Sequence, residues 1–178
     1  MNYTDEIMII HPSVEYKDQI IAALQSFQEK NEIMHGSGSL AKLDSVEEWI
    51  DEMEKNRYPE TVKAGMVPAD TFLGIRKSDN KLVGIINFRH ELNDLLFQFG
   101  GHIGYSILPE ERQKGYGKVM TMLAVEKARE FGLERIMITC EKKNAGSAKI
   151  IQGCGGILEN EAIRQDGEIV QRYWIKLR

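Results

Sequence analysis

The first 70 residues have a hydrophobic pattern that predicts mostly helix. Residues 7–10 form a short apolar run typical of a strand, and apolar side chains then recur at helical spacing from Tyr16 to Phe27. A second helix is expected after Ser45, because residues 45–48 have the form of a capping box. In that motif a hydroxyl oxygen accepts a hydrogen bond from a free N–H of the first turn. The intervening residues 36–39, Gly-Ser-Gly-Ser, predict a loop or lid.

Beyond residue 70 the pattern changes to that of strands. Residues 71–76 and 82–90 flank a turn signal at 78–81 and therefore predict a hairpin. Residues 101–108 predict a central strand, which a proline ends. Residues 91–99, between these strands, mix polar and apolar positions and fit neither a helix nor a strand.

The last third of the chain predicts two more helices among strands. An apolar stripe from Met120 to Phe131 predicts an amphipathic helix, and Gly132 is a natural C-cap. The elements expected after it are a strand at 135–140, a short helix from 144 to 153, and a hairpin that turns at 166–167 into a strand at 169–177. This order predicts a mixed α/β layered fold in which helices cover a sheet.

The composition is that of an ordinary globular domain of 178 residues. Hydrophobic residues make up 42% and charged residues 28%, so the chain can bury a core without disulfides or metal. The net charge of −4 argues against nucleic-acid binding, which depends on Lys and Arg neutralising phosphates. No stretch approaches the roughly 20 apolar residues that cross a bilayer. Two cysteines without zinc spacing or a secretory signal predict reduced thiols, no metal site and a cytoplasmic location.

The chemistry is concentrated in residues 103–118, where a strand leads through a loop into a helix. The first N–H groups of a helix lack intrahelical partners and carry partial positive charge. Gly115 and Gly117 have no side chains, so an anion can approach this backbone closely, and Arg112, Lys114 and Lys118 add positive charge. These features predict a phosphate site. The G-x-x-x-x-G-K-[ST] motif is absent and G-x-G-x-x-G lacks its last glycine, so neither nucleotide fingerprint fits.

The loop Arg112-Gln113-Lys114-Gly115-Tyr116-Gly117 has the form R-x-x-G-x-G and resembles the pyrophosphate-binding motif of the GNAT acetyltransferases. In that family the loop holds the diphosphate of coenzyme A, and the next strand is followed by N-x-x-S and a short helix. Asn144-Ala145-Gly146-Ser147 resembles that second motif in order and spacing. The resemblance covers about residues 71–174 of a single domain spanning 1–178, with residues 12–68 as a variable helical segment. The combination of Phe88-Arg89-His90 with residues 100–105 and 171–174 also resembles a bacterial branch of predicted acetyltransferases whose substrates are undefined.

The resemblance implies an N-acetyltransferase that uses acetyl-CoA and an amine-bearing substrate. Its GNAT-like sheet of about six to seven mostly antiparallel strands would splay between residues 103–108 and 135–140 to admit the pantetheine arm. A backbone N–H would polarise the thioester, and the amine would attack directly. The residues implied to bind the donor are Ile107, Leu108, Arg112, Gln113, Lys114, Gly115, Tyr116, Gly117, Lys118, Asn144 and Ser147. A homodimer is suggested by the family alone.

The catalytic residues are less well defined, because the sequence departs from the family at the usual general acid. Many GNAT enzymes have a Tyr seven residues after the Asn, where this chain has Ile151. Tyr105 is a candidate acid, and His90 and His102 are candidate bases, because imidazole titrates near neutral pH. Each also fits a structural role in the core or at a strand end. A thiolate can leave unaided, because its pKa is about 8.5.

Two other functions are compatible with the sequence. The leading hypothesis is the N-acetyltransferase, and the missing Tyr at position 151 motivates a second one, a non-catalytic acyl-CoA-binding or regulatory module on the same fold. Turnover of acetyl-CoA with an amine distinguishes an enzyme from such a module. A nucleotide-binding protein is the third hypothesis, and stabilisation by ATP or NAD in place of coenzyme A would indicate it. The sequence does not define the acceptor amine.

Overall fold

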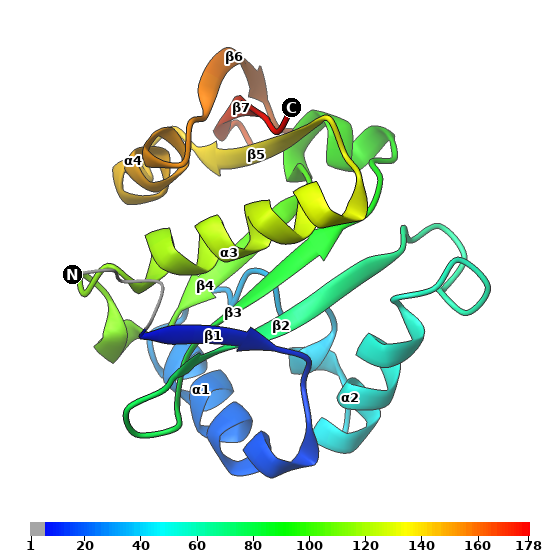
Figure 1. Cartoon of the computed structure of the whole chain (residues 1–178), viewed down its shortest axis with the longest axis vertical. Coiled ribbons are helices and arrows are strands. Elements are labelled where there is room, and N and C mark those ends of the chain that lie inside the picture. Colours follow the sequence, from blue (N-terminus) through cyan, green and yellow to red (C-terminus); the bar gives the residue numbers. More distant parts are fainter. Residues whose placement is uncertain (1–5) are drawn as a thin grey trace.

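The computed structural model describes residues 6–178, which form a seven-stranded sheet with helices on both faces (Figure 1). The sheet has the order β1-β2-β3-β4-β5-β7-β6, and its only parallel pair within the described residues is β4 with β5. The mixed, mostly antiparallel α/β fold expected from the sequence is therefore confirmed. The main elements are β1 (Ile7–Ile10), α1 (Lys17–Glu29), α2 (Val46–Lys55), β2 (Ala69–Arg76), β3 (Lys81–Arg89), β4 (Ile103–Ile107), α3 (Tyr116–Phe131), β5 (Arg135–Glu141), α4 (Ala145–Gly153), β6 (Ile157–Ile163) and β7 (Ile169–Lys176).

The helix ends follow the local sequence. Ser45 Oγ accepts a hydrogen bond from the backbone N–H of Glu48 at 3.1 Å, which is the hydroxyl half of the predicted capping box. Gly132 ends α3 with a φ of 101°, a left-handed conformation that favours glycine. Asn144 caps α4 through its side-chain oxygen. Across residues 6–178, no helix combines the length and apolarity needed to cross a membrane.

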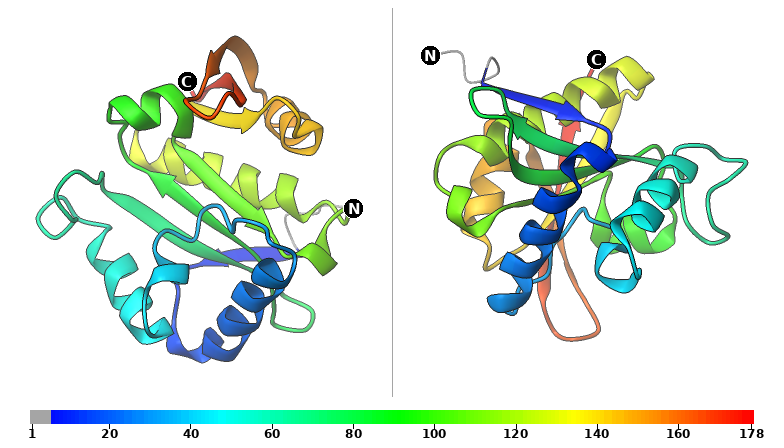
Figure 2. Two further views of the ribbon diagram at one scale, coloured as in Figure 1. Left: turned by 180° about the vertical axis from the view of Figure 1, so that it is seen from behind. Right: turned by 90° about the horizontal axis from the view of Figure 1, so that it is seen from below.

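Helices cover both faces of the sheet (Figure 2), and a hydrophobic cluster lies beneath them on each face. The first cluster packs α3, through residues such as Met120 and Ala124, against β3, β4, β5 and β7. The second cluster joins α1 and α2, through Phe27 and Trp49, to the other face of β2 and β3. Because apolar residues cover both faces, the central strands are buried almost throughout, and polar chemistry is confined to the places where strands end or separate.

The sheet separates between β4 and β5, as the sequence predicted. The two strands pair only at Ile103 and Ile138, beside an isolated bridge from Gly101, and then diverge toward their carboxyl ends (Figure 1). Residues 91–99, which fitted no pattern, lead into a single π-helical turn, Leu96–Gly100. That turn rests on β5, where Thr139 Oγ1 donates to the carbonyl oxygen of Phe99 at 2.8 Å.

Candidate active site

A cleft of about 750 Å³ opens where β4 and β5 diverge. Its walls come from the end of α1 and the loop after it, from β4, from the loop that begins α3, and from the end of β5 with the start of α4. The lining residues are Phe27, Glu32, Ile33, His35, Tyr105, Ser106, Ile107, Glu111, Arg112, Gln113, Gly115, Tyr116, Gly117, Lys118, Glu141, Asn144, Gly146, Ser147 and Ile150. The structure thus brings together most of the residues predicted to bind a donor, although they are separated along the chain.

The edge of β4 presents backbone groups to this cleft. Backbone groups of alternate residues along β4 and at its two ends bond to β3. The His102 carbonyl accepts from the Arg89 N–H, and the Leu108 N–H donates to the Val83 carbonyl. Because hydrogen-bonding directions alternate along a strand, Tyr105 and Ile107 direct theirs toward the gap. Ile107 can therefore fill the predicted backbone role. Leu108 cannot use its N–H in that role, and its side chain is buried in the second cluster.

The loop before α3 has the backbone geometry that an anion site requires. Gly115 has a φ of 85°, and an added Cβ there would meet nothing within 4 Å, so glycine is favoured by its conformation. At Gly117 space is the constraint, because an added Cβ would lie 2.9 Å from Ile150 Cδ1 and 3.4 Å from Ile107 Cγ1. Gln113 also has a positive φ, of 62°. Because Gly115 and Gly117 both line the cleft, no side chain at these two positions blocks an anion from the first backbone N–H groups of α3.

The positive charges of the loop differ in how far they are neutralised. The Arg112 guanidinium pairs with Glu32 across the cleft and donates through Nε to Ile107 O at 3.3 Å. Lys114 pairs with the buried Glu111 at 2.9 Å. Lys118 forms no ion pair with any residue of the range 6–178, so its charge is available to a bound anion.

Glu111 connects the loop before α3 to the sheet through ion pairs. Its carboxylate is also paired with Arg76 at 2.8 Å and with Lys81 at 2.7 Å. Burial alone would raise its pKa, but hydrogen bonds from Lys114, Lys81 and Arg76 outweigh that effect and lower the pKa to about 2. The carboxylate therefore stays ionised and ties the loop to β2 and β3.

Tyr105 and Ser147 meet within the cleft. The Tyr105 hydroxyl lies 3.0 Å from Ser147 Oγ, and burial raises the pKa of Tyr105 to about 12 although the Ser147 bond opposes this. Asn144 uses its side-chain oxygen to accept from the Ser147 N–H at 3.0 Å, which leaves its amide nitrogen to donate elsewhere. Ile151, at the position of the usual acid, is fully buried in the first cluster.

The two histidines predicted as bases lie outside this cleft. His102 is buried, and its Nδ1 accepts a hydrogen bond from the Met137 N–H at 2.9 Å. Burial lowers the pKa of His102 to about 4, which leaves it neutral and structural. His90 Nε2 instead bonds to Asp70 Oδ2 at 2.8 Å. Both histidines therefore fit the structural role at a strand end, which the sequence also allowed, better than the role of a base in this cleft.

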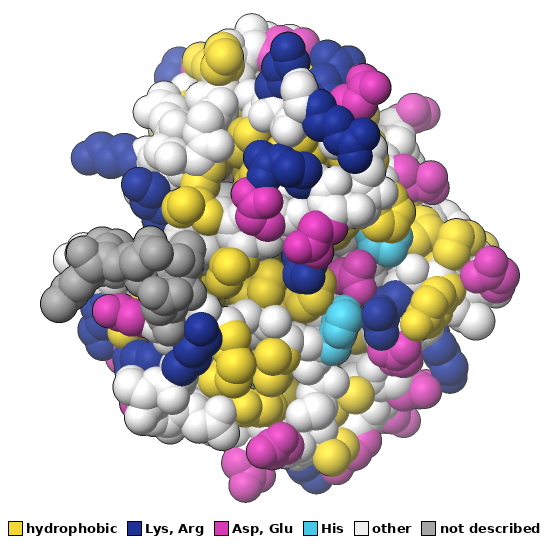
Figure 3. All heavy atoms as spheres, viewed as in Figure 1, with side chains coloured by type: hydrophobic (Ala, Val, Ile, Leu, Met, Phe, Trp, Pro, Cys, Tyr) yellow, Lys and Arg dark blue, Asp and Glu magenta, His cyan; other side chains and the backbone are white. Residues whose placement is uncertain are grey.

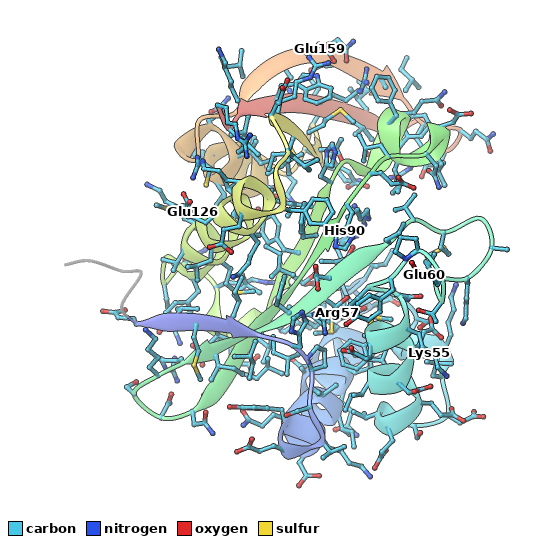
Figure 4. All side chains as sticks on the ribbon, turned by 45° about the vertical axis from the view of Figure 1, so that its right-hand side comes forward. Lys55, Arg57, Glu60, His90, Glu126 and Glu159 are labelled. Atoms are coloured by element: carbon cyan, nitrogen blue, oxygen red, sulfur yellow. The ribbon has the colours of Figure 1, made fainter. Side chains whose placement is uncertain are left out.

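His90 belongs to a second hollow, of about 400 Å³, which we call the lateral pocket. There its ring stacks on Phe131 with centroids 4.4 Å apart, and Asp70 also bonds to His11 and Arg57. Figure 3 shows histidine side chains next to acidic and basic ones on this face, and Figure 4 labels Arg57 and His90. The lateral pocket and the cleft have no lining residue in common.

His35 and Glu141 are polar residues of the cleft that the sequence did not single out as catalytic. The His35 ring keeps contact with solvent, yet partial burial lowers its pKa, although the charge of Glu141 acts in the opposite direction. The position of His35 depends on the next residue, Gly36. An added Cβ at Gly36 would lie 2.5 Å from Gly104 O, so this loop packs directly on β4.

An open β4 edge, beside a helix start able to bind a phosphate, defines a class of acyl-CoA-dependent acyltransferases. The chain matches the model of the acetyltransferase (GNAT) domain over residues 9–157. It therefore belongs to the GNAT acetyltransferase family. A comparison with curated protein sequences found no significant match.

Solved structures share this fold at low sequence identity. A microcin self-immunity acetyltransferase in complex with acetyl-CoA and AMP has a TM-score of 0.68 and 18% identity, covering 97% of this chain and 93% of that one. The dodecameric spermidine N-acetyltransferase of Vibrio cholerae has a TM-score of 0.67 and 15% identity, covering 97% and 95%. A ribosomal-protein alpha-N-acetyltransferase with coenzyme A has a TM-score of 0.68 and 15% identity, covering 97% and 94%.

Proposed function

We propose that the chain transfers the acetyl group of acetyl-CoA to a primary amine by direct attack, with the donor bound in the cleft between β4 and β5. One observation carries this proposal: the open edge of β4 and the glycine-containing start of α3 face the same cleft. The strand edge can pair with the amides of pantetheine, as it would with an added strand. The loop can bind the diphosphate through its main-chain amides and Lys118.

The cleft residues can supply the proton transfers. The amine nitrogen bonds to the acetyl carbon, its proton passes to neutral His35, and the carbon–sulfur bond breaks. The departing thiolate takes a proton from Tyr105, whose hydroxyl is in turn within hydrogen-bond distance of Ser147. An N–H of the β4 edge, at Tyr105 or Ile107, stabilises the negative charge that develops on the carbonyl oxygen. Most of the acceleration is assigned to holding amine and thioester together.

Calorimetry with coenzyme A and a thiol-release assay with a panel of amines test this proposal separately. Gly117→Ala should bind coenzyme A nearly as wild type, because the terminal methyl of Ile150 can shift away. Gly117→Val should weaken binding by about tenfold or more, because its extra methyl groups would crowd Ile107 and Tyr105, which also line the cleft. If Gly117→Ala and Gly117→Val bound coenzyme A with the same affinity, the assignment of this loop as the diphosphate site would be contradicted. Tight binding without turnover of any amine would favour a non-catalytic acyl-CoA-binding module.

A further inference from the structure

Arg89 lies beside the proposed reaction centre. It is the last residue of β3, and its guanidinium reaches across Gly104 of β4, where an added Cβ would be 3.1 Å from Nη2. Gly104 immediately precedes Tyr105, the first residue whose backbone faces the gap. The Gly36 nitrogen is 3.7 Å from the same point, so the loop that carries His35 adjoins this position. Arg89 does not itself line the cleft, but its guanidinium adjoins the backbone before Tyr105 and the loop of His35, and both of those residues do line it.

The Arg89 guanidinium has no anionic partner among residues 6–178. Arg89 Nη1 donates to the carbonyl oxygens of Gly100 at 3.1 Å and Gly101 at 2.8 Å. Its Nε and Nη2 bond to no residue of the range 6–178, and both keep some accessible surface. No carboxylate of residues 6–178 forms an ion pair with Arg89. Two donors of a fixed, planar fork are thus left for a ligand.

The pKa of Arg89 reflects this lack of a partner. Burial lowers the pKa of Arg89 to about 10, and no nearby carboxylate offsets the effect. Arginines with acid partners behave in the opposite way, since hydrogen bonds to Asp79 and Asp166 raise the pKa values of Arg76 and Arg164. A buried cation without a counter-ion is destabilising, and an incoming anion would relieve that destabilisation.

A second buried arginine contacts the same segment. Arg172 of β7 is 9% exposed, and its Nε and Nη2 are buried without a partner. Its guanidinium lies over the Phe97 ring, 4.7 Å from the centroid, while Arg89 holds the carbonyls at the end of that turn. Arg172 Nη1 donates to Asn160 Oδ1 at 3.0 Å and lies 3.7 Å from a carboxylate oxygen of Glu159. Two largely buried arginines, of which only Arg172 has a carboxylate partner among residues 6–178, therefore adjoin the Leu96–Gly100 turn.

Opposite charge is found close by. Glu141 lines the cleft and pairs with Arg164 at 3.0 Å and with Lys143 at 3.5 Å, so its charge is partly neutralised. The charges of Glu141, Arg164 and Arg89 all act on the His35 ring. An ammonium or amine is favoured on the side of His35 and Glu141, and an anion on the side of Arg89. A polyamine would place a further positive charge toward Arg89, which is unfavourable.

We propose that the acceptor is a small amino acid-like molecule whose carboxylate binds Arg89 while its amine faces His35 and Glu141. This inference rests on the proposed acetyl transfer and names its substrate class. A carboxylate fits the two unused donors of a guanidinium in a bidentate manner. Such binding would hold the amine beside the thioester and would select against acceptors that lack the carboxylate.

The test uses sets of three acceptors that share a side chain: the free amino acid, its carboxamide and the decarboxylated amine. Spermidine and an amidated peptide with a free N-terminus complete the panel. We expect kcat/KM for the preferred amino acid to exceed that of its carboxamide by about tenfold to a hundredfold, the value of a charged hydrogen bond. Arg89→Gln should reduce that ratio to about one, and Arg89→Lys should retain part of it.

Arg135→Gln is the control, because Arg135 is an exposed arginine of β5 that lies over the Trp174 ring and has no ion pair within residues 6–178. It should leave the ratio unchanged. Equal or faster turnover of carboxamides, decarboxylated amines, spermidine or the peptide by wild-type protein would overturn the carboxylate proposal and leave acetyl transfer standing. If coenzyme A binds but no acceptor of any class is acetylated, the proposed function fails and this inference fails with it.

Discussion

The two glycines at the ends of α3 provide a matched test of the proposed diphosphate site. Gly115 precedes the helix with a φ of 85°, and Gly132 follows it with a φ of 101°. An added Cβ meets no atom within 4 Å at either position. Alanine therefore introduces the same kind of backbone strain at both ends without a steric clash. Only Gly115 belongs to the cleft.

The expected magnitudes follow from this geometry. A left-handed alanine costs about 1–2 kcal/mol, so Gly115→Ala and Gly132→Ala should each lower the free energy of unfolding by that amount. For a chain of this length that corresponds to about 2–8 °C in Tm. If Gly115→Ala displaces one or two amides that bind the diphosphate, affinity should fall by a further factor of about ten to a hundred. Gly132→Ala should bind as wild type.

Thermal unfolding and calorimetric titration with coenzyme A measure both effects on the same samples. Comparable destabilisation of the two variants, with weaker binding only in Gly115→Ala, is the expected result. The reasoning would be refuted if Gly115→Ala were destabilised like Gly132→Ala and yet bound coenzyme A within twofold of wild type. In that case the left-handed turn would serve only to start the helix.

Three further outcomes are expected. Tyr105→Phe should lower kcat by about tenfold to a hundredfold near pH 7, with a smaller loss above about pH 8.5, where the thiolate leaves unaided; a loss independent of pH would contradict an acid role in a kinetic pH profile. His102 has a folded pKa of about 4, below its ordinary value of 6.5, so the stability it contributes is present above pH 6.5 and is lost as the pH falls toward 4. That loss amounts to about 3 kcal/mol, and His102→Asn should remove this part of the pH dependence in urea titrations; an unchanged profile would show that another group causes it. Glu111→Gln should destabilise the fold by about 2 kcal/mol in the same titrations at pH 7, because three cations lose their common partner, and no change would show that solvent replaces the carboxylate fully.

The local parts of the fold were predictable because short-range physical signals determine them. Helix caps at Ser45, Asn144 and Gly132 depend on hydrogen bonds or backbone angles within a few residues, and each is where the sequence indicated. The Leu96–Gly100 turn was not predicted, because it depends on contacts with β5, such as the bond from Thr139. Its sequence carries no periodicity that reports those contacts.

The site residues also divide into those that a local sequence pattern identifies and those that contacts remote along the chain determine. The loop of Arg112 to Lys118 could be identified because one strand–loop–helix segment contains the whole anion site. The choice of His90 and His102 could not be checked from the sequence, because the partners that fix them, Asp70 and Met137, are remote along the chain. His35 was missed for the converse reason, since its place in the cleft follows from the packing of Gly36 on β4, which a single sequence does not reveal.

Burial has opposite effects on the two groups proposed to move protons, and both effects suit the reaction. It raises the pKa of Tyr105 to about 12, because a phenolate would be poorly solvated there, so the side chain keeps the proton that a leaving thiolate can take. Partial burial lowers the pKa of His35, although the residue remains exposed and Glu141 acts in the opposite direction, and this favours the neutral ring that can accept a proton from an amine. One partly desolvated cleft thereby favours the acid form of one residue and the base form of the other at neutral pH. No tyrosine is then needed at position 151, where the fold requires a buried apolar side chain.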